Sequence, residues 1–418
     1  MNDKQKPSIR FKGFTEAWEQ RKLGDIVGIY DGVHQTPNYQ NSGVMFLSVE
    51  NIATLKSSKF ISEEDFKRDY KVFPQENDIL MTRIGDVGTT NVVTDNGLKA
   101  YYVSLALLKY KSTDPYFLSN AIQSDYVQKG LANRTLKTAI PMKINKDEIG
   151  KVSVMLPLSA TEQQQIGTCF RNLDNLITLH QRKYDKLVNV KKSMLEKMFP
   201  RDGKNVPEIR FSGFTEAWEQ RKFDEVFDCT IPNNTLSRAE LNYESGSVRN
   251  IHYGDILIKY GSVVDVQNDE IPFATGKSSD DFKGALLQDG DIIIADTAED
   301  ETTGKACEIG NSQGLDVVSG LHTMVCRPRD KMALGYLGYY LNSDAYHHQL
   351  LPLMQGIKVL SLSRTNVQKT MVCYPKSNAE QQLIADCFRN LDKLITLHQR
   401  EVEKLQNIKK SCLEKMFA

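Results

Sequence analysis

The residues with the clearest chemical potential are a glycine-bearing turn, an acidic stretch and a few histidines. Gly85-Asp86-Val87-Gly88 matches part of a glycine-rich nucleotide-binding turn, but the third glycine and the following helix are missing, which favours an ordinary turn. The stretch from Asp291 to Lys305 could form a nuclease-like acidic cluster. The first half of the chain has no counterpart, so a solvated acidic loop is the better interpretation. Three histidines lack a consistent metal-ligand spacing: His322, His347 and His348.

Other catalytic signatures are also missing from the sequence. There is no Pro-Pro pair, and hence no Asn/Asp-Pro-Pro-Tyr cluster of the kind that amino-methyltransferases use. There is no GxxxxGK(S/T) phosphate loop. We therefore expect no catalytic residue, no metal and no cofactor in this chain.

Polar loops at corresponding places in the two halves of the chain are the remaining candidates for a site. They are rich in Arg, Lys, Asn, Ser and Thr, the side chains that contact base edges and phosphates. In the first half the candidate DNA-binding residues are Thr82, Arg83, Thr89, Thr90, Asn91, Arg134, Lys137 and Thr138. In the second half they are Thr302, Thr303, Lys305, Lys358, Ser361, Ser363 and Arg364.

Composition limits the class of protein. With 418 residues the chain can form two to four domains. Its 53 basic and 53 acidic residues cancel, which is unusual for an autonomous DNA binder. If the chain contacts nucleic acid, we expect a partner to supply much of the phosphate contact. The 7 cysteines form no CxxC pair and are typical of a reducing compartment. No membrane span or signal peptide is evident, so we expect a cytoplasmic protein.

The chain is duplicated. Ile9–Lys22 returns almost unchanged as Ile209–Lys222, and Glu162–Phe199 returns as Glu380–Phe417. The repeated aromatic residues Phe11, Phe14 and Trp18, matched by Phe211, Phe214 and Trp218, are expected to pack in the core. Two similar units, and not a solenoid of short repeats, follow from this order.

The longer repeat predicts a helix of about 38 residues, roughly 57 Å long, in each copy. Apolar residues recur at a seven-residue spacing on one face of each, which requires a partner of equal length, and the other copy is the obvious partner. Polar residues interrupt the face at His180 and Lys191, and at His398 and Lys409. The predicted pairing residues are Ile166, Phe170, Leu173, Ile177, Tyr184, Leu187, Met194, Met198, Ile384, Phe388, Leu391, Ile395, Val402, Leu405 and Met416.

The two blocks between the repeats are weakly parallel. The first predicts a helix over Asp114–Lys129 and a last strand over Val152–Leu156. Corresponding segments are Asn77–Met81 with Gly290–Ile294, Thr89–Asn91 with Thr302–Gly304, Ser124-Asp125 with Ser343-Asp344, Thr138–Lys146 with Gly356–Arg364, and Pro157 with Pro375. A shared scaffold with unlike surfaces is the expectation.

We predict an α+β fold with two mixed α/β recognition domains, separated by a long antiparallel two-helix coiled coil in a pseudo-two-fold, circular layout. The final helix would return beside the first domain. The predicted segments are a repeat at 1–22, a first domain at 23–160, a helix at 161–200, a linker and second repeat at 201–222, a second domain at 223–378, and a helix at 379–418.

In this layout the chain resembles the specificity subunit of a type I restriction-modification system. The resemblance is carried by the two diverged blocks, each closed by Pro-x-x-x-x-Glu-Gln-x-x-Ile at Pro157–Ile166 and Pro375–Ile384, and by FRNLD-x-LITLHQR in both long helices. It implies that each block reads one half of a bipartite DNA sequence. It also implies two adenine-methylating modification subunits that bind S-adenosylmethionine, and two motor-nuclease restriction subunits that use ATP and Mg.

Other interpretations remain open from the sequence alone. The chain could be a protein-interaction scaffold, a nuclease that uses the Asp291–Lys305 region, a methyltransferase with an atypical site, or a stand-alone repressor-like DNA binder. Zero net charge and the lack of a helix-turn-helix disfavour the last.

Overall fold

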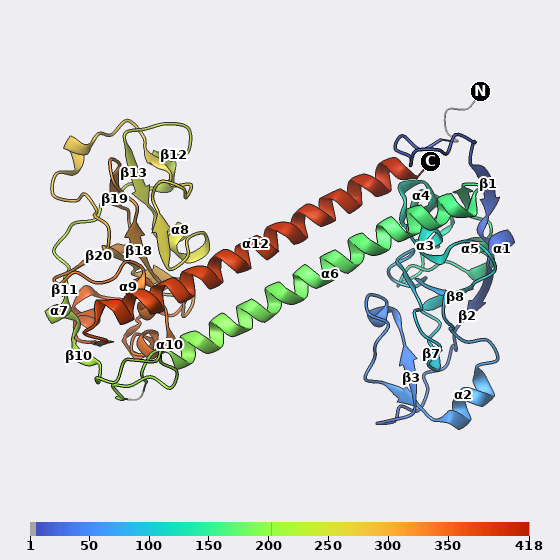
Figure 1. Cartoon of the computed structure of the whole chain (residues 1–418), viewed down its shortest axis with the longest axis horizontal. Coiled ribbons are helices and arrows are strands. Elements are labelled where there is room, and N and C mark those ends of the chain that lie inside the picture. The colour runs from blue at the N-terminus through green and yellow to red at the C-terminus, as the bar shows by residue number, and fades with distance from the viewer. Residues whose placement is uncertain (1–5, 202, 418) are drawn as a thin grey trace. The chain divides into compact units, whose positions relative to one another are not determined.

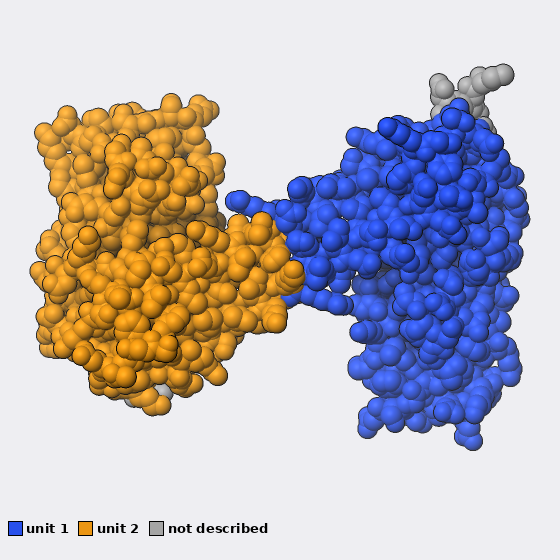
Figure 2. All heavy atoms as spheres, viewed as in Figure 1, with its two compact units in different colours: residues 1–182, 399–418 blue, residues 183–398 orange. Residues whose placement is uncertain are grey.

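The computed structural model describes residues 6–201 and 203–417, which divide into two compact units (Figure 2). Unit 1 comprises Met1–Arg182 and Gln399–Ala418, and unit 2 comprises Lys183–His398. The end of the chain therefore belongs to the unit that contains its beginning. The Ile9 backbone N–H donates to the Lys415 carbonyl at 2.9 Å, which places the end of the last helix beside the first repeat, as predicted.

Unit 1 is built on two small sheets and a two-stranded ribbon. The central sheet has the order β2 (Gly28–Asp31), β8 (Leu105–Lys109), β5 (Ile79–Thr82), β6 (Thr90–Val92). The second sheet has the order β4 (Phe60–Ile61), β3 (Val44–Leu47), β7 (Lys99–Tyr101), and the ribbon pairs β1 (Glu19–Lys22) with β9 (Ser153–Leu156). The helices are α1 (Leu23–Ile26), α2 (Glu63–Asp69), α3 (Pro115–Gln123), α4 (Asp125–Arg134), α5 (Lys146–Gly150) and α6 (Ala160–Lys197).

Unit 2 has the same arrangement, but each of its two sheets has one strand more than the matching sheet of unit 1. Its central sheet has the order β11 (Phe227–Asp228), β20 (Thr323–Pro328), β16 (Ile292–Ala295), β18 (Ala306–Gly310), β14 (Val263–Asp265). Its second sheet has the order β12 (Leu241–Asn242), β15 (Phe273–Ala274), β13 (Val248–Ile251), β19 (Asp316–Ser319). Two ribbons pair β10 (Glu219–Lys222) with β22 (Met371–Tyr374), and β17 (Thr297–Ala298) with β21 (Leu360–Ser361). The helices are α7 (Phe223–Val226), α8 (Tyr253–Ile258), α9 (Tyr336–Leu341), α10 (Asp344–His347), α11 (Arg364–Val367) and α12 (Asn378–Met416).

One helix predicted from the sequence is two helices in the structure. The expected helix over Asp114–Lys129 breaks at Ser124, which has extended backbone angles and whose hydroxyl donates to the Ala121 carbonyl at 2.7 Å. This bond offers the backbone an alternative to continued helix, and the chain restarts with Ser124 at the N-cap of α4. The matching Ser343 precedes α10 and makes the same kind of bond to the Tyr340 carbonyl.

The other expected correspondences can be checked through hydrogen bonds. Asn77 and Gly290 both adopt positive φ before the central strands β5 and β16. The Gln163 side chain donates to the Pro157 carbonyl, and Gln381 donates to the Pro375 carbonyl in the same way. The Ile144 N–H donates to the Arg83 carbonyl as the Leu362 N–H donates to the Asp296 carbonyl. These matches confirm that the two units share one framework.

The long helices α6 and α12 lie side by side (Figure 1). In unit 1 the Lys409 ammonium lies 2.6 Å from an Asp174 carboxylate oxygen, and in unit 2 Lys191 lies 2.5 Å from Asp392. As residue numbers rise along α6, those of the partners on α12 fall, so the pairing is antiparallel. Each lysine that interrupts the apolar face is thus matched by the aspartate of the FRNLD segment in the other copy.

The apolar face predicted from the seven-residue spacing is the covered face of each helix. All fifteen predicted pairing residues are buried or half-buried, and so are His180 and His398, whereas most other positions along the middle of the helices are exposed. The aromatic residue at the end of each helix packs beside the start of the other one. Phe417 contacts Phe170 at 5.6 Å between ring centroids, and Phe199 stacks on Phe388 at 5.8 Å.

A buried carboxylate at the first turn of each long helix joins it to the short repeat. Arg10 donates two hydrogen bonds to Glu162, Nε to Oε1 at 2.6 Å and Nη2 to Oε2 at 2.8 Å, and the Trp18 indole N–H adds a longer one at 3.4 Å. Glu162 is 1% exposed and Trp18 is 2% exposed, so the pair lies inside the unit, and the predicted core position of the tryptophan is confirmed.

Unit 2 repeats this cluster. Arg210 donates to both Glu380 oxygens at 2.7 and 2.9 Å, and Trp218 donates at 3.2 Å. The other repeated aromatic residues, at positions 11, 14, 211 and 214, are half-buried. Both units therefore hold their long helix by the same three side chains.

Among residues 6–201 and 203–417, no helix is long and apolar enough to cross a membrane.

Truncation of Arg10 tests how strongly this cluster holds unit 1. In Arg10→Ala the Glu162 carboxylate stays buried without its guanidinium partner, which is expected to cost about 3–5 kcal/mol of unfolding free energy. Chemical unfolding followed by circular dichroism measures the loss. Arg68→Ala is the matched control, because the Arg68 side chain is 66% exposed and its removal should leave stability near that of the parent protein. Equal stability of the two variants would contradict the account.

A buried glutamate in unit 2 should make stability depend on pH. Glu308 is 1% exposed, and burial raises its pKa from the ordinary 4.5 to about 7, although backbone N–H groups of Gly335 and Gly338 donate to it at 2.7 and 2.8 Å. The folded unit then holds this proton at a pH where the unfolded chain has lost it. Stability contributed by the group is full below pH 4.5 and is lost as pH rises through about 7.

The expected loss of unfolding free energy across that window is about 3 kcal/mol. Unfolding of the parent protein and of Glu308→Gln at several pH values measures it, because glutamine cannot titrate and should flatten this part of the profile. A variant whose profile keeps the slope of the parent would show that another group is responsible.

Candidate nucleic-acid interface

The site in unit 1 is formed at one end of the central sheet by two loops that are far apart in sequence. Strand β5 ends at Thr82, and residues 83–89 connect it to β6. A hairpin over Leu136–Lys143 lies against this connection, since Ile84 pairs with Lys143 and the Gly85 N–H donates to the Met142 carbonyl at 2.8 Å. The hairpin holds itself together through a bond from the Leu136 N–H to the Lys143 carbonyl at 2.8 Å.

Unit 2 places two loops at the same end of its central sheet. Strand β16 ends at Ala295, and residues 296–305 connect it to β18. A hairpin over Gln355–Ser361 lies beside this connection through the pairing of β17 with β21. Its ends exchange backbone hydrogen bonds of 3.0 and 2.8 Å. The same two-loop arrangement therefore occurs in both units.

One correspondence expected from the sequence is wrong by three residues. Thr302–Gly304 was expected to match Thr89–Asn91, but Met81 pairs with Thr90 in unit 1, whereas Ile294 pairs with Ala306 in unit 2. The connection is three residues longer in unit 2, at 296–305 against 83–89, so an alignment without a gap misplaces it. The glycine of the turn is shared, because Gly88 donates to the Thr82 carbonyl as Gly304 donates to that of Ala295.

Eight of the candidate DNA-binding residues are exposed on these loops and on the segments that flank them. In unit 1 they are Arg134, Lys137 and Thr138, and in unit 2 they are Thr302, Lys358, Ser361, Ser363 and Arg364. Four of them have local partners. Arg134 donates to Glu148 at 3.0 Å, and the Thr302 N–H donates to Asp300 at 2.9 Å. The Ser361 hydroxyl donates to the Gln355 carbonyl at 3.4 Å, and the Ser363 hydroxyl accepts the Asn366 N–H at 3.3 Å. These residues can reach a ligand from the solvent side.

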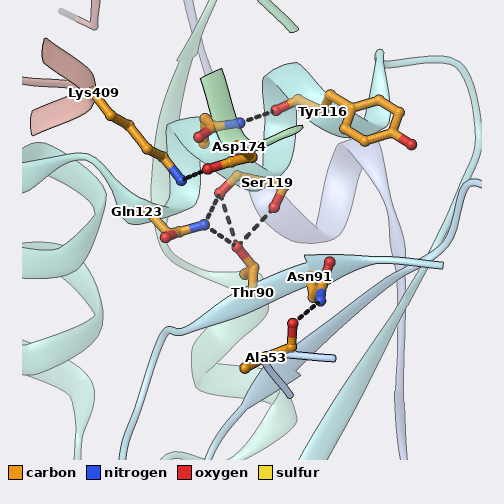
Figure 3. Close-up of polar contacts among 9 residues, drawn as sticks. Ala53, Thr90, Asn91, Tyr116, Ser119, Gln123, Asp174 and Lys409 are labelled. Carbon is orange, nitrogen blue, oxygen red and sulfur yellow. Dashed lines mark hydrogen bonds and ion pairs between the residues drawn. The ribbon is translucent and has the colours of Figure 1, made fainter. Parts of the chain in front are cut away.

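Four candidates are instead buried, and the structure gives them internal partners. The Arg83 guanidinium is 4% exposed, donates to the Ile144 carbonyl at 3.0 Å and pairs with Asp31. Thr82 accepts the Thr89 N–H at 3.0 Å. Thr303 donates to the Asp300 carbonyl at 2.9 Å. The fourth, Thr90, donates to the Ser119 carbonyl at 2.9 Å, as Figure 3 shows.

The remaining three candidates, Thr89, Asn91 and Lys305, are half-buried. The Asn91 amide donates to the carbonyls of Ile52 and Ala53 at 2.9 and 3.1 Å, and Figure 3 draws the second of these bonds. The Lys305 ammonium donates to the carbonyls of Leu257 and Tyr260 at 3.0 and 3.2 Å, and burial lowers its pKa. The side chains of Asn91 and Lys305 thus have internal partners, and neither points freely into solvent.

The structure adds exposed residues that sequence reasoning missed. Lys143 and Lys146 are exposed at the end of the unit 1 hairpin and just after it. The side chains of Ile140 and Ile357, near the hairpin tips, are fully exposed. The signal was present in the stretch Lys137–Lys146, which holds three lysines and no acidic residue.

The residues considered for catalysis have structural partners instead. Asp291 is 1% exposed, and Arg327 donates to both of its oxygens at 2.7 Å. His347 and His348 lie within hydrogen-bond distance of the carbonyls of Glu301 and Asp344, at 2.8 and 2.7 Å. Within the described part of the chain, no group of three His, Cys, Asp or Glu residues could hold a metal ion.

Taken together, two mixed α/β units with one framework, unlike exposed loops and a shared pair of long helices define a recognition protein. A family model described as the type I restriction modification DNA specificity domain matches residues 15–189 and again residues 215–407. The chain belongs to this family. It is a DNA specificity subunit of a type I restriction-modification system and is itself non-catalytic.

Individual relatives agree with this assignment. The chain is 22% identical over 411 residues to the type I restriction enzyme MjaVIII specificity subunit of Methanocaldococcus jannaschii. The matched region covers 95% of this chain and 91% of the relative. It is 22% identical over 426 residues to a putative type I restriction enzyme MjaX specificity subunit of the same organism, covering 95% and 92%.

Among solved structures, the S subunit of a type I restriction-modification system from M. genitalium has the same fold. It matches with a TM-score of 0.59 over 99% of both chains, at 14% sequence identity.

Two lysines of unit 2 provide a test of the interface. Lys358 is exposed at the hairpin tip, whereas Lys305 is hydrogen-bonded inside. Lys358→Ala should weaken DNA binding and reduce the slope of log affinity against log salt by roughly 1, the contribution of one phosphate contact. Lys305→Ala should leave the slope unchanged and lower thermal stability. Filter binding at a series of salt concentrations measures the slopes, and the reverse pattern would contradict the placement.

Proposed function

We propose that each unit reads one half of an asymmetric, gapped DNA sequence and positions a modification subunit beside it. The observation that carries the proposal is that one framework presents two different exposed loop surfaces. Unit 1 presents the hairpin Leu136–Lys143 and unit 2 presents Gln355–Ser361, and these sequences differ in length and in most residues. Two unlike surfaces on one framework suit two unlike half-sites.

Hydrogen-bonding and cationic side chains on these loops support base and phosphate contacts. Lys137, Thr138 and Lys143 are exposed in unit 1, and Lys358 and Arg364 are exposed in unit 2. Such side chains bind phosphates and read base edges in the major groove. We assign the exposed candidates to DNA contact and the buried ones to support of the loops. Arg83 and Asp296 occupy equivalent positions in the two units. The residue below the loops is therefore a cation in unit 1 and an acidic residue in unit 2.

The repeated parts of the chain suit two copies of one partner. Identical residues cannot read different sequences, but they can present the same contact surface twice. We assign these surfaces to two adenine-methylating modification subunits, which would carry S-adenosylmethionine. Two motor-nuclease restriction subunits, which would use ATP and Mg, complete the restricting assembly, and the complex acts in the cytoplasm. Zero net charge of this chain fits a complex in which partners make many of the phosphate contacts.

B-DNA geometry sets the expected target. Two reading surfaces on one side of the duplex lie about one helical turn apart, roughly 10 base pairs centre to centre. If each surface reads about three or four pairs, about six or seven unread pairs remain between them. The recognised sequence should therefore be gapped and asymmetric.

Domain exchange tests the proposal. Residues 23–160 are replaced by the corresponding block of another specificity subunit, and adenine methylation is mapped across the genome in cells that also express the modification subunit. One half of the gapped motif should change and the other half should remain, because the units share a framework but not a surface. A strain that lacks this chain is the control and should lose the motif. A change in both halves, or methylation that does not depend on this chain, would contradict the proposal.

A further inference from the structure

The hairpins at the candidate interface each expose an isoleucine completely. The relative exposure of the Ile140 and Ile357 side chains is 100% for both, the highest among the exposed large apolar residues. Leaving such a side chain in water forgoes the favourable free energy of burying it. Single exposed apolar residues are common on proteins. The recurrence of a fully exposed isoleucine on the equivalent hairpin of both units is the unusual feature.

Further apolar side chains surround each tip. Met142 is 43% exposed and Leu136 is 45% exposed on the unit 1 hairpin, which also carries Pro141. On the unit 2 hairpin Val359 is 51% exposed. Each hairpin therefore presents a small apolar tip to solvent.

The backbone holds both tips out from the unit. In unit 1 the hairpin is tied to the loop that follows β5 through the Met142 carbonyl, which accepts the Gly85 N–H. In unit 2 the turn requires Gly356, whose φ is +126° and whose position would place a Cβ 1.9 Å from the Val359 carbonyl oxygen. A side chain at position 356 would not fit, so the geometry that projects Ile357 depends on this glycine.

The charges around the tips indicate what covers them. Lys137 and Lys143 bracket the unit 1 tip, and Lys358 follows Ile357 directly in unit 2. Neither hairpin, 136–143 nor 355–361, contains an acidic residue. An apolar tip between cations is complementary to a polyanion with an apolar interior, which describes a DNA duplex with its stacked bases between phosphates.

We propose that Ile140 and Ile357 act as wedges that enter between stacked base pairs, one in each half of the target, and kink the duplex there. The inference rests on the proposed function, in which this end of each unit faces DNA. Isoleucine is one of the side chains that unstack base steps in proteins that bend DNA. Because the same residue serves both units, the wedge does not read sequence, and flexible pyrimidine–purine steps are its preferred targets. Reading is left to the neighbouring polar side chains.

Local unstacking can be measured in the assembled complex. The full chain with its modification subunits is bound to a duplex that carries the gapped motif found by methylation mapping. A fluorescent adenine analogue, whose emission rises on unstacking, is placed in turn at each position except the methylated adenine. The parent complex should give a rise at one step in each half. Ile140→Ala should remove the rise in the first half only, and Ile357→Ala in the second half only.

A matched control is available in unit 1. Leu98 is 47% exposed and lies between β6 and β7, at the end of β6 that is far from the candidate loops. Leu98→Ala should change neither fluorescence signal. Both tip variants should keep the thermal stability of the parent, because the removed atoms are solvent-exposed. Each should bind the duplex about tenfold more weakly, and each should leave the methylated motif unchanged.

The outcomes separate the wedge from the function on which it rests. Failure of the parent complex to bind the motif preferentially would overturn the proposed function. Preferential binding without a rise in emission, or with a rise that persists in Ile140→Ala and Ile357→Ala, would overturn the wedge alone. A changed half-motif in either variant would also overturn it, because the isoleucine would then be reading a base.

Discussion

A buried glutamate at the start of each long helix is the contact on which the architecture depends. Glu162 and Glu380 sit in the first turn of α6 and α12, where a negative charge is favoured by the helix dipole. Each is nevertheless buried, a position that is stable only with a partner that supplies positive charge and donors. Arg10 and Arg210 provide both, in a bidentate geometry that fixes direction as well as distance.

The consequence is that the first turn of each long helix is held against the short repeat of the same unit. The short repeat that carries the arginine also forms the ribbon strand, β1 in unit 1 and β10 in unit 2, which pairs with the last strand before the helix. The end of the other long helix packs into the same core through Phe417 in unit 1 and Phe199 in unit 2. Repeats, ribbon and helix ends thus pack together in the same way in both units, and these are the parts of the sequence that differ least between the two halves of the chain.

The parts of the structure that could be predicted from sequence are those with a repeating physical signal. The seven-residue spacing identified the covered face of both helices, since burial recurs with the helical period. Pairing of Lys191 with Asp392 could also have been derived from antiparallel pairing of the two copies. The break at Ser124 depends on a local hydrogen bond, and the difference after β16 is three additional residues in a loop, so neither left a periodic signal. The burial of Arg83 depends on Asp31, a partner 52 residues away in the sequence. The polar composition of its loop suggested a DNA contact for Arg83, whereas in the structure its guanidinium is buried inside unit 1.

We propose that the paired helices α6 and α12 set the number of unread base pairs between the two half-sequences. Lengthening both helices tests this claim. Four residues, about one helical turn, are inserted into both α6 and α12 at matched points of the antiparallel pair, and the methylated motif is mapped again. The number of unread base pairs should change, while both half-sequences stay the same. An unchanged gap, or altered half-sequences, would contradict it.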